Sequence, residues 1–498
     1  MVSSKPKRDR SIGIRPGAIA LRICLRRWFA VKTLETDYLV VGAGATGMAF
    51  TDTLIEESDA DVVMVDRRAN PGGHWNDAYP FVRLHQPSAV YGVNSRRLGT
   101  DRIDEVGPNA GFYERATAAE ICDYYRRVLD EELLASGQVR FFGMSTYVGS
   151  DAGSHRFESR LTGETTVVTV RRRLVDATYV EAPIPATHTP PFDVDPDARL
   201  ITPTDLVELG DPADGFTVIG AGKTAMDTCG WLLDHDVAPD DIRWIRPRDP
   251  WTLPRRKMQT LELLPSLMEW SSRRIEAAAK ADDVPDFFRR LEASGVVVPL
   301  DPEVEPEVFR GAILSRDERD DLRRIHDVVR KGYVRRLEAD HIVLDDGTVP
   351  TDPQHVHVDC TAHGVETPPA RPVFEPDRIT LQYIHTPVSF SAALTAYVEA
   401  TRDDDAEKNR LCLPTPFPSD AADLIRYTLT TQRARAVWQA EPDIEDWLRH
   451  CRIGFVQGHD DHLDDPRMQA ALERIEEHRE SAMANLEWLW ELAESSSS

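Results

Sequence analysis

The sequence predicts an α/β fold with two Rossmann-like domains, a helical insertion and a helical C-terminal region. Two glycine-rich turns about 180 residues apart carry this prediction, and each follows an apolar strand and opens a helix. One such turn is a weak signal, because short glycine motifs recur by chance. Two turns in the same strand–turn–helix context predict two domains that each bind a dinucleotide.

The first turn, Gly42-Ala43-Gly44-Ala45-Thr46-Gly47, follows the strand Tyr38–Val41. In such turns the first glycine allows the tight bend, the second lets the backbone approach a pyrophosphate, and the third packs helix against strand. The helix N-terminus then offers free N–H groups to the phosphates. The next strand ends at Asp66, followed by Arg67, and an acid there accepts ribose hydroxyls and repels a 2′-phosphate. This site therefore suits FAD or NAD.

The second turn, Gly220-Ala221-Gly222-Lys223-Thr224-Ala225, follows the strand Phe216–Ile219. Ala225 takes the third position, where a small residue is needed. The next strand, Ile242–Arg248, ends without an acid and carries Arg246 and Arg248 instead. Guanidinium groups bind phosphate in a bidentate fork, so this site is interpreted as an NADPH site. The alternative is that the two arginines only form a solvated strand end.

Bulk properties exclude several classes of protein. The chain has 498 residues, 41% of them hydrophobic, which is enough for two or three domains with sizeable cores. A net charge of −25 argues against nucleic acids and anionic membranes as partners. The six cysteines form no CxxC pair, which excludes a dithiol redox centre or a cysteine-rich zinc site, so no metal is expected.

The N-terminal segment differs from the rest of the chain. Nine of its first 32 residues are Lys or Arg, and only Asp9 is acidic. Arg26-Arg27-Trp28-Phe29 hints at a twin-arginine signal, but no separate apolar region follows it. We expect a disordered basic arm, or a start of translation nearer Val31. With no transmembrane-length run and scattered cysteines, a cytoplasmic location is expected.

The remaining elements follow from periodicity and turn signals. Thr117–Ser136 has helical apolar spacing, and Thr117 with Glu120 has the spacing of a capping box. Alternating β-rich runs predict an antiparallel meander between residues 138 and 179, and Asp345-Asp346-Gly347 predicts a hairpin after His341–Leu344. Further predicted elements are a helical insertion over 258–336, a strand at 355–360, and helices over 420–438 and 468–492.

Four features give the chain a family resemblance. They are the two glycine turns, the GGxW-like sequence Gly72-Gly73-His74-Trp75, the Tyr79–Tyr91 stretch, and the linker pair Asp176-Ala177-Thr178 and Asp359–Ala362. Together they resemble the two-dinucleotide-binding flavoproteins, and most closely the class B flavin monooxygenases, which include Baeyer–Villiger and N-hydroxylating enzymes. The resemblance implies FAD and NADPH as cofactors, with the NADPH domain inserted in the FAD domain.

The resemblance also sets expected domain boundaries. These are a basic arm at 1–35, the first part of the FAD-binding domain at 36–205, the NADPH-binding domain with its helical insertion at 206–354, a return segment of the FAD-binding domain at 355–400, and the helical C-terminal region at 401–498.

The chain departs from the family pattern in two places. The family fingerprint FxGxxxH should precede the second glycine turn, but Phe192–Asp197 does not match it. The Baeyer–Villiger branch has an acid where His85 stands. These departures weaken the prediction that the protein inserts oxygen, but they do not affect the prediction of its cofactors.

Candidate catalytic residues follow the first dinucleotide strand. Gly72 and Gly73 let the backbone approach a flavin, and Trp75 either packs beside its rings or is a core residue. His74, Arg83 and His85 come next, and a cation or hydrogen-bond donor there would stabilise negative charge on the flavin. The alternative for each of the three is a structural hydrogen bond.

The sequence therefore predicts an oxidoreductase in which NADPH reduces FAD. The resemblance implies that reduced FAD reacts with O2 to a C4a-(hydro)peroxide and oxygenates a small organic substrate. The alternatives are an NADPH-dependent flavin dehydrogenase or reductase, and a non-catalytic redox sensor. The C-terminal helices either cover the substrate cavity or form a face for a second copy of the chain.

Overall fold

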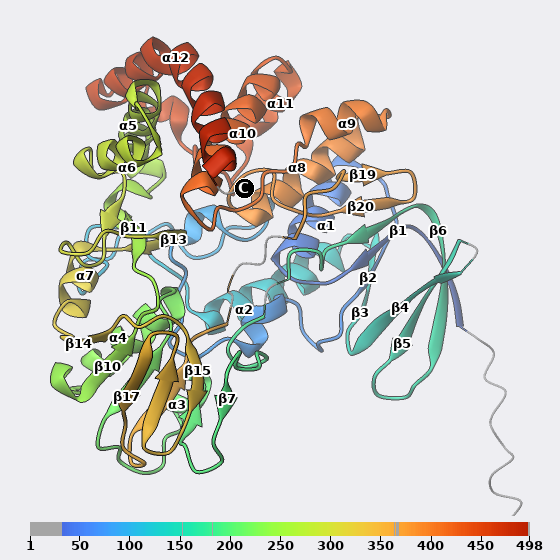
Figure 1. Ribbon diagram of the computed structural model, residues 1–498. Helices are drawn as coiled ribbons and strands as arrows, with labels where there is room; N and C mark the ends of the chain where they lie inside the picture. Colours follow the sequence, from blue (N-terminus) through green and yellow to red (C-terminus); the bar gives the residue numbers. More distant parts are fainter. Residues whose placement is uncertain (1–31, 152, 182, 363, 365–367, 497–498) are drawn as a thin grey trace, which may run out of the picture.

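The computed structural model describes residues 32–151, 153–181, 183–362, 364 and 368–496. The first Rossmann-like domain, the second one and a layer of C-terminal helices form three regions (Figure 1). Most of the expected arm lies outside the described residues. Its boundary at residue 35 is wrong, because strand β1 (Lys32–Val41) begins at Lys32, which pairs with Thr166.

The first domain is built on an eight-stranded sheet with the order β19-β20-β6-β1-β2-β3, extended by β4 and β5. Its strands and helices are β2 (Val62–Val65), β3 (Val139–Phe142), β4 (Ser145–Asp151), β5 (Ser154–Ser159), β6 (Thr165–Asp176), β19 (Phe374–Glu375), β20 (Arg378–Thr380), α1 (Ala45–Glu57) and α2 (Ala118–Arg127). Strands β1, β2 and β3 are parallel, as a Rossmann-like unit requires. The predicted antiparallel meander is confirmed in β4, β5 and β6.

Helix α2 begins as its sequence predicts. Thr117 accepts a hydrogen bond from the backbone N–H of Glu120, whose side chain accepts one from the Thr117 N–H, so the capping box is confirmed. The helix continues as a π-helical turn over Val128–Leu133. Its apolar face packs in the core of the first domain.

The second domain has a five-stranded parallel sheet with the order β14-β10-β9-β18-β8. Its elements are β8 (Leu200–Ile201), α3 (Pro203–Leu206), β9 (Phe216–Ile219), α4 (Lys223–Asp234), β10 (Ile242–Ile245), β14 (Asp327–Val329) and β18 (Val356–Asp359). Two expected domain boundaries are wrong. Strand β8 lies before residue 206 and strand β18 lies after residue 355, where we expected the first domain, but both strands pair inside this second sheet. The chain returns to the first sheet only at β19, so the fold confirms one domain inserted in another.

Two small sheets and the insertion complete the second domain. The sheets have the orders β12-β11-β13 and β17-β16-β15-β7. The elements are β7 (Asp193–Val194), β11 (Pro250–Pro254), α5 (Leu264–Lys280), α6 (Val284–Ala293), β12 (Val298–Pro299), β13 (Val308–Leu314), α7 (Arg316–Leu322), β15 (Val334–Leu337), β16 (His341–Leu344) and β17 (Gly347–Pro350). The predicted hairpin is confirmed in β16 and β17. The insertion is helical only as far as α6, since strands and one short helix follow it.

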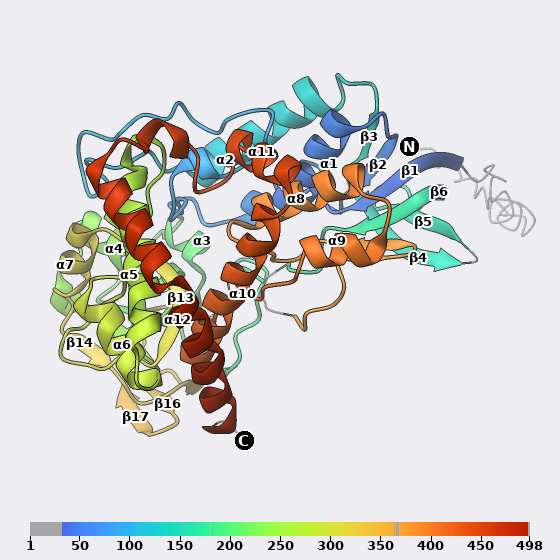
Figure 2. The same cartoon turned by 90° about the horizontal axis from the view of Figure 1, so that it is seen from above.

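The C-terminal region is helical, as predicted. It contains α8 (Val388–Thr401), α9 (Asp405–Leu411), α10 (Ala421–Gln439), α11 (Pro442–His450) and α12 (Pro466–Ser496). Helix α8 packs on α1 of the first domain, whereas α12 packs on α5 of the insertion and on α10 (Figure 2). These helices therefore bridge the two domains. None of the helices in the described part of the chain combines the length and apolar character that a membrane span requires.

We predict that Gly47→Ala disrupts the first domain. A Cβ on Gly47 would overlap the carbonyl oxygen of Gly42, which belongs to the rigid turn. Gly230 is the matched control, because it also lies inside a Rossmann helix but no atom lies within 4 Å of its added Cβ. Gly230→Ala should stabilise the protein by up to about 1 kcal/mol. Thermal unfolding of both variants tests this, and equal midpoints would contradict it.

Candidate functional site

The first glycine turn has the geometry of a dinucleotide cradle. Gly42 has a φ of +102°, which a side chain would strain. Helix α1 follows with Gly44 at its N-cap and no side-chain cap, so its first N–H groups have no side-chain acceptor. Asp66 lies against this turn, with Oδ2 accepting a 2.6 Å hydrogen bond from the Ala43 N–H. The carboxylate is thus fixed at the turn, and a turn with an acid at this place fits a dinucleotide whose ribose carries free hydroxyls, such as FAD or NAD.

The Gly72–Trp75 segment lies directly on this turn. A Cβ on Gly73 would be 2.9 Å from the Cα of Gly44, so only glycine allows the two backbones to approach so closely. The Trp75 Nε1 donates a 2.7 Å hydrogen bond to the Tyr91 hydroxyl, and the exposed His74 lies beside Trp75. Arg67, also exposed, forms an ion pair with Glu181.

The second glycine turn has the same geometry as the first. Gly220 has a φ of +136°, and a Cβ there would be 2.6 Å from the carbonyl oxygen of Cys360. Helix α4 also lacks a side-chain cap, and no atom lies within 4 Å of a Cβ on Gly222. Ala225 is fully buried, as expected for the third position. The turn leaves open space at a helix N-terminus, which fits a second pyrophosphate.

The two predicted phosphate-binding arginines have different surroundings. Arg246 is 3% exposed, and its guanidinium lies 2.8 Å from Asp249 and 5.0 Å from the centre of the Trp244 ring. Arg330 pairs with the same Asp249. Arg248 is partly exposed and lies over the ring of Tyr333 at 5.8 Å. Arg248 is thus the accessible member of the pair, and Arg246 is held inside an ion-pair network.

A segment of the first domain joins the two glycine turns. The chain from Tyr79 leaves the Gly72–Trp75 loop and lies on α4, the helix that opens from the second turn. The Tyr79 hydroxyl donates a 2.9 Å hydrogen bond to Asp227, and Phe81 stacks on Trp231 with ring centres 5.2 Å apart. The two dinucleotide cradles therefore share one wall.

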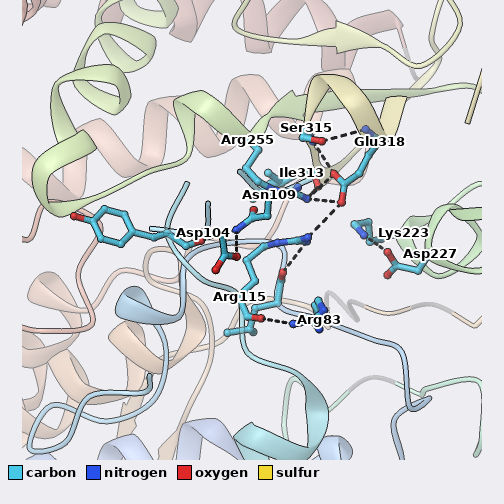
Figure 3. Close-up of polar contacts among 12 residues, drawn as sticks. Arg83, Asp104, Asn109, Arg115, Lys223, Asp227, Arg255, Ile313, Ser315 and Glu318 are labelled. Carbon is cyan, nitrogen blue, oxygen red and sulfur yellow. Dashed lines mark hydrogen bonds and ion pairs between the residues drawn. The ribbon is translucent and has the colours of Figure 1, made fainter. Parts of the chain in front are cut away.

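A charged cluster fixes this junction (Figure 3). Glu318 of α7 receives a 3.0 Å hydrogen bond from Arg255 and one of 3.4 Å from Arg115 of the first domain. Burial alone would raise the pKa of Glu318, but the positive charges of Arg255, Lys223 and Arg115 outweigh it and lower the pKa to about 2. The carboxylate stays ionised and ties the two domains together.

His85 lies next to this cluster, and Arg83 contacts it through the Arg115 carbonyl. His85 lines a cavity, and burial together with the charges of Lys223, Arg115 and Arg255 lowers its pKa well below the usual value. His85 is therefore neutral at pH 7 and can act as a hydrogen-bond donor but not as a cation. Arg83 is exposed, donates to the Arg115 carbonyl, and lines a groove of about 750 Å³ to which Arg115, Asp227 and Glu318 also contribute.

The cavity at His85 has a volume of about 270 Å³. Its walls come from β11, α5, β13 and α10, and from the loop before α8 that carries His385 and Thr386. Most of its lining is apolar, as is typical of small-molecule sites. No group of three or more His, Cys, Asp or Glu side chains that could bind a metal occurs in the part of the chain described here.

Several residues of this junction escaped the sequence analysis. Asp227 lies one helical turn after Lys223 and pairs with it, and that spacing was a usable signal. Ser315 and Glu318 form a capping box, which marks a helix start but not the partner Arg255. Arg274 interrupts the apolar face of α5, which was a further signal.

Comparison with known proteins identifies relatives. A family model described as NAD(P)-binding Rossmann-like domain matches residues 40–93. Uncharacterized protein Rv2000 of Mycobacterium tuberculosis (strain ATCC 25618 / H37Rv) is 48% identical over 427 residues, covering 85% of this chain and 78% of the relative. The chain belongs to the same family as this protein. Uncharacterized protein Mb2023 of Mycobacterium bovis (strain ATCC BAA-935 / AF2122/97) matches with the same identity and coverage.

Solved structures with a similar arrangement are distant in sequence. An open crystal structure of cyclohexanone monooxygenase is 15% identical, with 82% of this chain and 98% of that chain covered and a TM-score of 0.48. A flavin-containing monooxygenase from Stenotrophomonas maltophilia is 14% identical, with coverages of 83% and 99% and a TM-score of 0.43. At this distance the activity of the chain has to be inferred from its own residues.

Glu318 should make the protein sensitive to acid. Its folded pKa of about 2 lies below the usual glutamate pKa of 4.5, so its stabilising effect is complete above pH 4.5 and is lost as the pH falls toward 2. One pKa unit corresponds to about 1.4 kcal/mol, so about 2 kcal/mol should disappear between pH 5 and pH 3. Denaturant unfolding across this range should show a flatter pH dependence for Glu318→Gln. An unchanged slope would contradict the pairing.

Proposed function

We propose that the protein is an FAD-dependent, NADPH-consuming oxidoreductase, and specifically a monooxygenase that inserts one oxygen atom from O2 into a small organic molecule. The observation that carries the proposal is the shared wall between the two glycine turns. Tyr79 and Phe81 contact α4, while the segment that contains them begins at the Gly72–Trp75 loop against the first turn. We propose that two dinucleotides bound at these turns exchange a hydride across this wall.

The first turn would hold FAD through several of its residues. The uncapped N-terminus of α1 would donate backbone hydrogen bonds to the pyrophosphate, with Gly42, Gly44 and Gly47 allowing the approach. Asp66 would accept the ribose hydroxyls. When bound, FAD would supply the hydride acceptance and the reaction with O2, and the protein would position it and exclude water.

The second turn would hold NADPH. The uncapped N-terminus of α4 would bind its pyrophosphate, and Arg248 would bind the 2′-phosphate beside Tyr333. Arg246 would contribute positive charge at this strand end while its ion pair with Asp249 fixes its position. The acid that would repel a 2′-phosphate in the first site has no counterpart at this strand end.

His85 is the proposed donor at the reaction site. Being neutral, it would donate a hydrogen bond to negative charge that develops nearby, without the solvation cost of a buried cation. His74 and Arg83 remain predicted site residues, but both are exposed, so His85 is better placed than either.

A specific observation favours a second candidate, an NADPH-dependent flavin dehydrogenase or reductase that inserts no oxygen. In place of the family fingerprint, Asp193–Val194 forms strand β7, which pairs with β15. A non-catalytic redox sensor is the third candidate. For each of the three candidates we propose a cytoplasmic protein that binds a small molecule and no nucleic acid. We also propose that the C-terminal helices form the contact with a second copy of the chain if the protein is a homo-oligomer.

The oxygen chemistry can be tested by rapid mixing. Reduced protein exposed to O2 with NADP+ bound should show a transient near-ultraviolet band that differs from oxidised and reduced flavin. His85→Ala should shorten the lifetime of this band and divert electrons to hydrogen peroxide, while NADPH consumption continues. Reoxidation in one step with stoichiometric peroxide, whatever substrate is offered, would favour the dehydrogenase. An intact transient in His85→Ala would remove only the role of His85.

Arg248→Ala should weaken NADPH selectively. Loss of a charged hydrogen-bonding partner removes roughly 1.5–3 kcal/mol, or about ten- to a hundredfold in affinity. The KM for NADPH should rise by this factor while the KM for NADH stays nearly constant. Arg243→Ala is the matched control, because Arg243 lies on β10, five residues before Arg248, but pairs with Asp327. Equal effects of Arg248→Ala on both nucleotides would contradict the assignment.

A further inference from the structure

The cavity beside His85 is positively charged inside an acidic protein. The whole chain carries a net charge of −25, yet three of the residues that line this cavity are arginines: Arg274, Arg310 and Arg435. Among the residues that the structure describes, no Asp or Glu lines it. An apolar cavity with arginines and no acids is an unusual place to put positive charge, because buried cations are normally paired.

Two of these arginines, Arg274 and Arg435, have no carboxylate partner among the described residues, and Arg274 is the more deeply buried of the two. It lies on the cavity-lining stripe of α5 with Leu267 and Ser271, and only 9% of it is exposed. Its guanidinium lies 4.8 Å from the centre of the Trp270 ring, while its Nε has no hydrogen-bond partner. No ion pair of Arg274 occurs within the described parts of the chain. Burial and the charge of Arg435 lower its pKa to about 10.

Arg435 reaches the same cavity from α10. It follows Leu424, Tyr427 and Thr431 along the face of that helix which lines the cavity. It also borders a second cavity of about 460 Å³, so it lies where the two spaces adjoin. Burial lowers its pKa, and within the described residues it too has no carboxylate partner. The positive charges of Arg435 and Arg274 both act on His385.

The contacts of Arg274 and Arg435 do not compensate their charges. The aromatic ring near Arg274 attracts its guanidinium and recovers only part of the lost hydration. The rest of the cost of removing a guanidinium from water is recovered only by an opposite charge in good geometry. Two such groups facing one cavity are therefore a stability cost. An anionic ligand between them would remove the cost, because its carboxylate would accept charge-assisted hydrogen bonds from both.

We propose that this cavity binds a small carboxylic acid with an apolar body, and that Arg274 and Arg435 hold its carboxylate. Phe309, Leu253 and Met268 would contact the apolar body. The inference rests on the proposed function, since His85 lines the same cavity and the bound acid would be the molecule that is oxidised. A volume of about 270 Å³ favours a monocarboxylate of modest size.

Calorimetric titration of the flavin-loaded protein tests the proposal without turnover. The probes are straight-chain carboxylates from butanoate to decanoate and phenylacetate, each paired with its methyl ester, which keeps the shape but loses the charge. At least one acid should bind tenfold or more tightly than its ester. Arg274→Met and Arg435→Met should each weaken that acid at least tenfold. Arg273→Met is the matched control, because Arg273 is exposed on the same helix and pairs with Glu276.

Thermal unfolding without ligand gives a second measurement. Arg274→Met removes an unpaired buried charge and puts an apolar side chain of similar length in its place. The midpoint of thermal unfolding of this variant should therefore lie above that of wild type. A purely structural role for Arg274 would lower the midpoint instead.

Three results would overturn the proposal. One is equal affinity for every acid and its ester, and another is unchanged acid binding in both arginine variants. The third is a loss of NADP+ binding with carboxylate binding intact, which would assign the arginines to the dinucleotide. Flavin content and NADPH oxidation are measured separately in each variant. If wild-type protein neither contains flavin nor oxidises NADPH, the proposed oxidoreductase function is wrong. The carboxylate titration then still tests the carboxylate site independently.

Discussion

The ion pairs of Glu318 with Arg115 and Arg255 hold the two Rossmann-like domains in one arrangement. Arg255 is 1% exposed, so its charge is tolerable only because the carboxylate lies 2.6 Å away. Removing one partner of such a buried pair costs roughly 3–5 kcal/mol, since the other charge remains buried and unpaired. The contact of the Tyr79–His85 segment with α4 depends on this junction. Burial lowers the pKa of His85 most, and the positive charges of Arg115 and Arg255 at this junction lower it further.

The features that sequence predicted are those whose cause is local. Each glycine turn follows from steric limits within a few residues, such as the space that Gly47 leaves for the Gly42 carbonyl. The capping box at Thr117 and the hairpin at Asp345–Asp346 likewise involve neighbours in the chain. Asp66 was predictable because its distance from the turn is set by the length of one helix and one strand. Interactions between residues close in the chain were therefore enough to predict the fold class and both glycine turns.

The features that escaped prediction depend on partners far apart in the chain. Arg246 and Arg248 have equivalent positions in the sequence, and only the fold shows that Asp249 and Asp301 surround the first of them. Strand β18 has the same apolar pattern as a strand of either sheet, and its pairing with β9 decides its domain. The low pKa of His85 comes first from its burial and then from the charges of Lys223, Arg115 and Arg255, which lie on three other segments.

The acidic surface and the arginine-lined cavity act over different distances. A net charge of −25 disfavours the approach of an anion, but salt at physiological strength screens exposed charges beyond about 8 Å. Inside the cavity the dielectric constant is lower and the guanidinium groups are close, so their attraction is much stronger. Arg435 borders both cavities, and Arg274 is more deeply buried. Selection for the proposed carboxylate would then come from the interior, whereas the surface charge serves solubility.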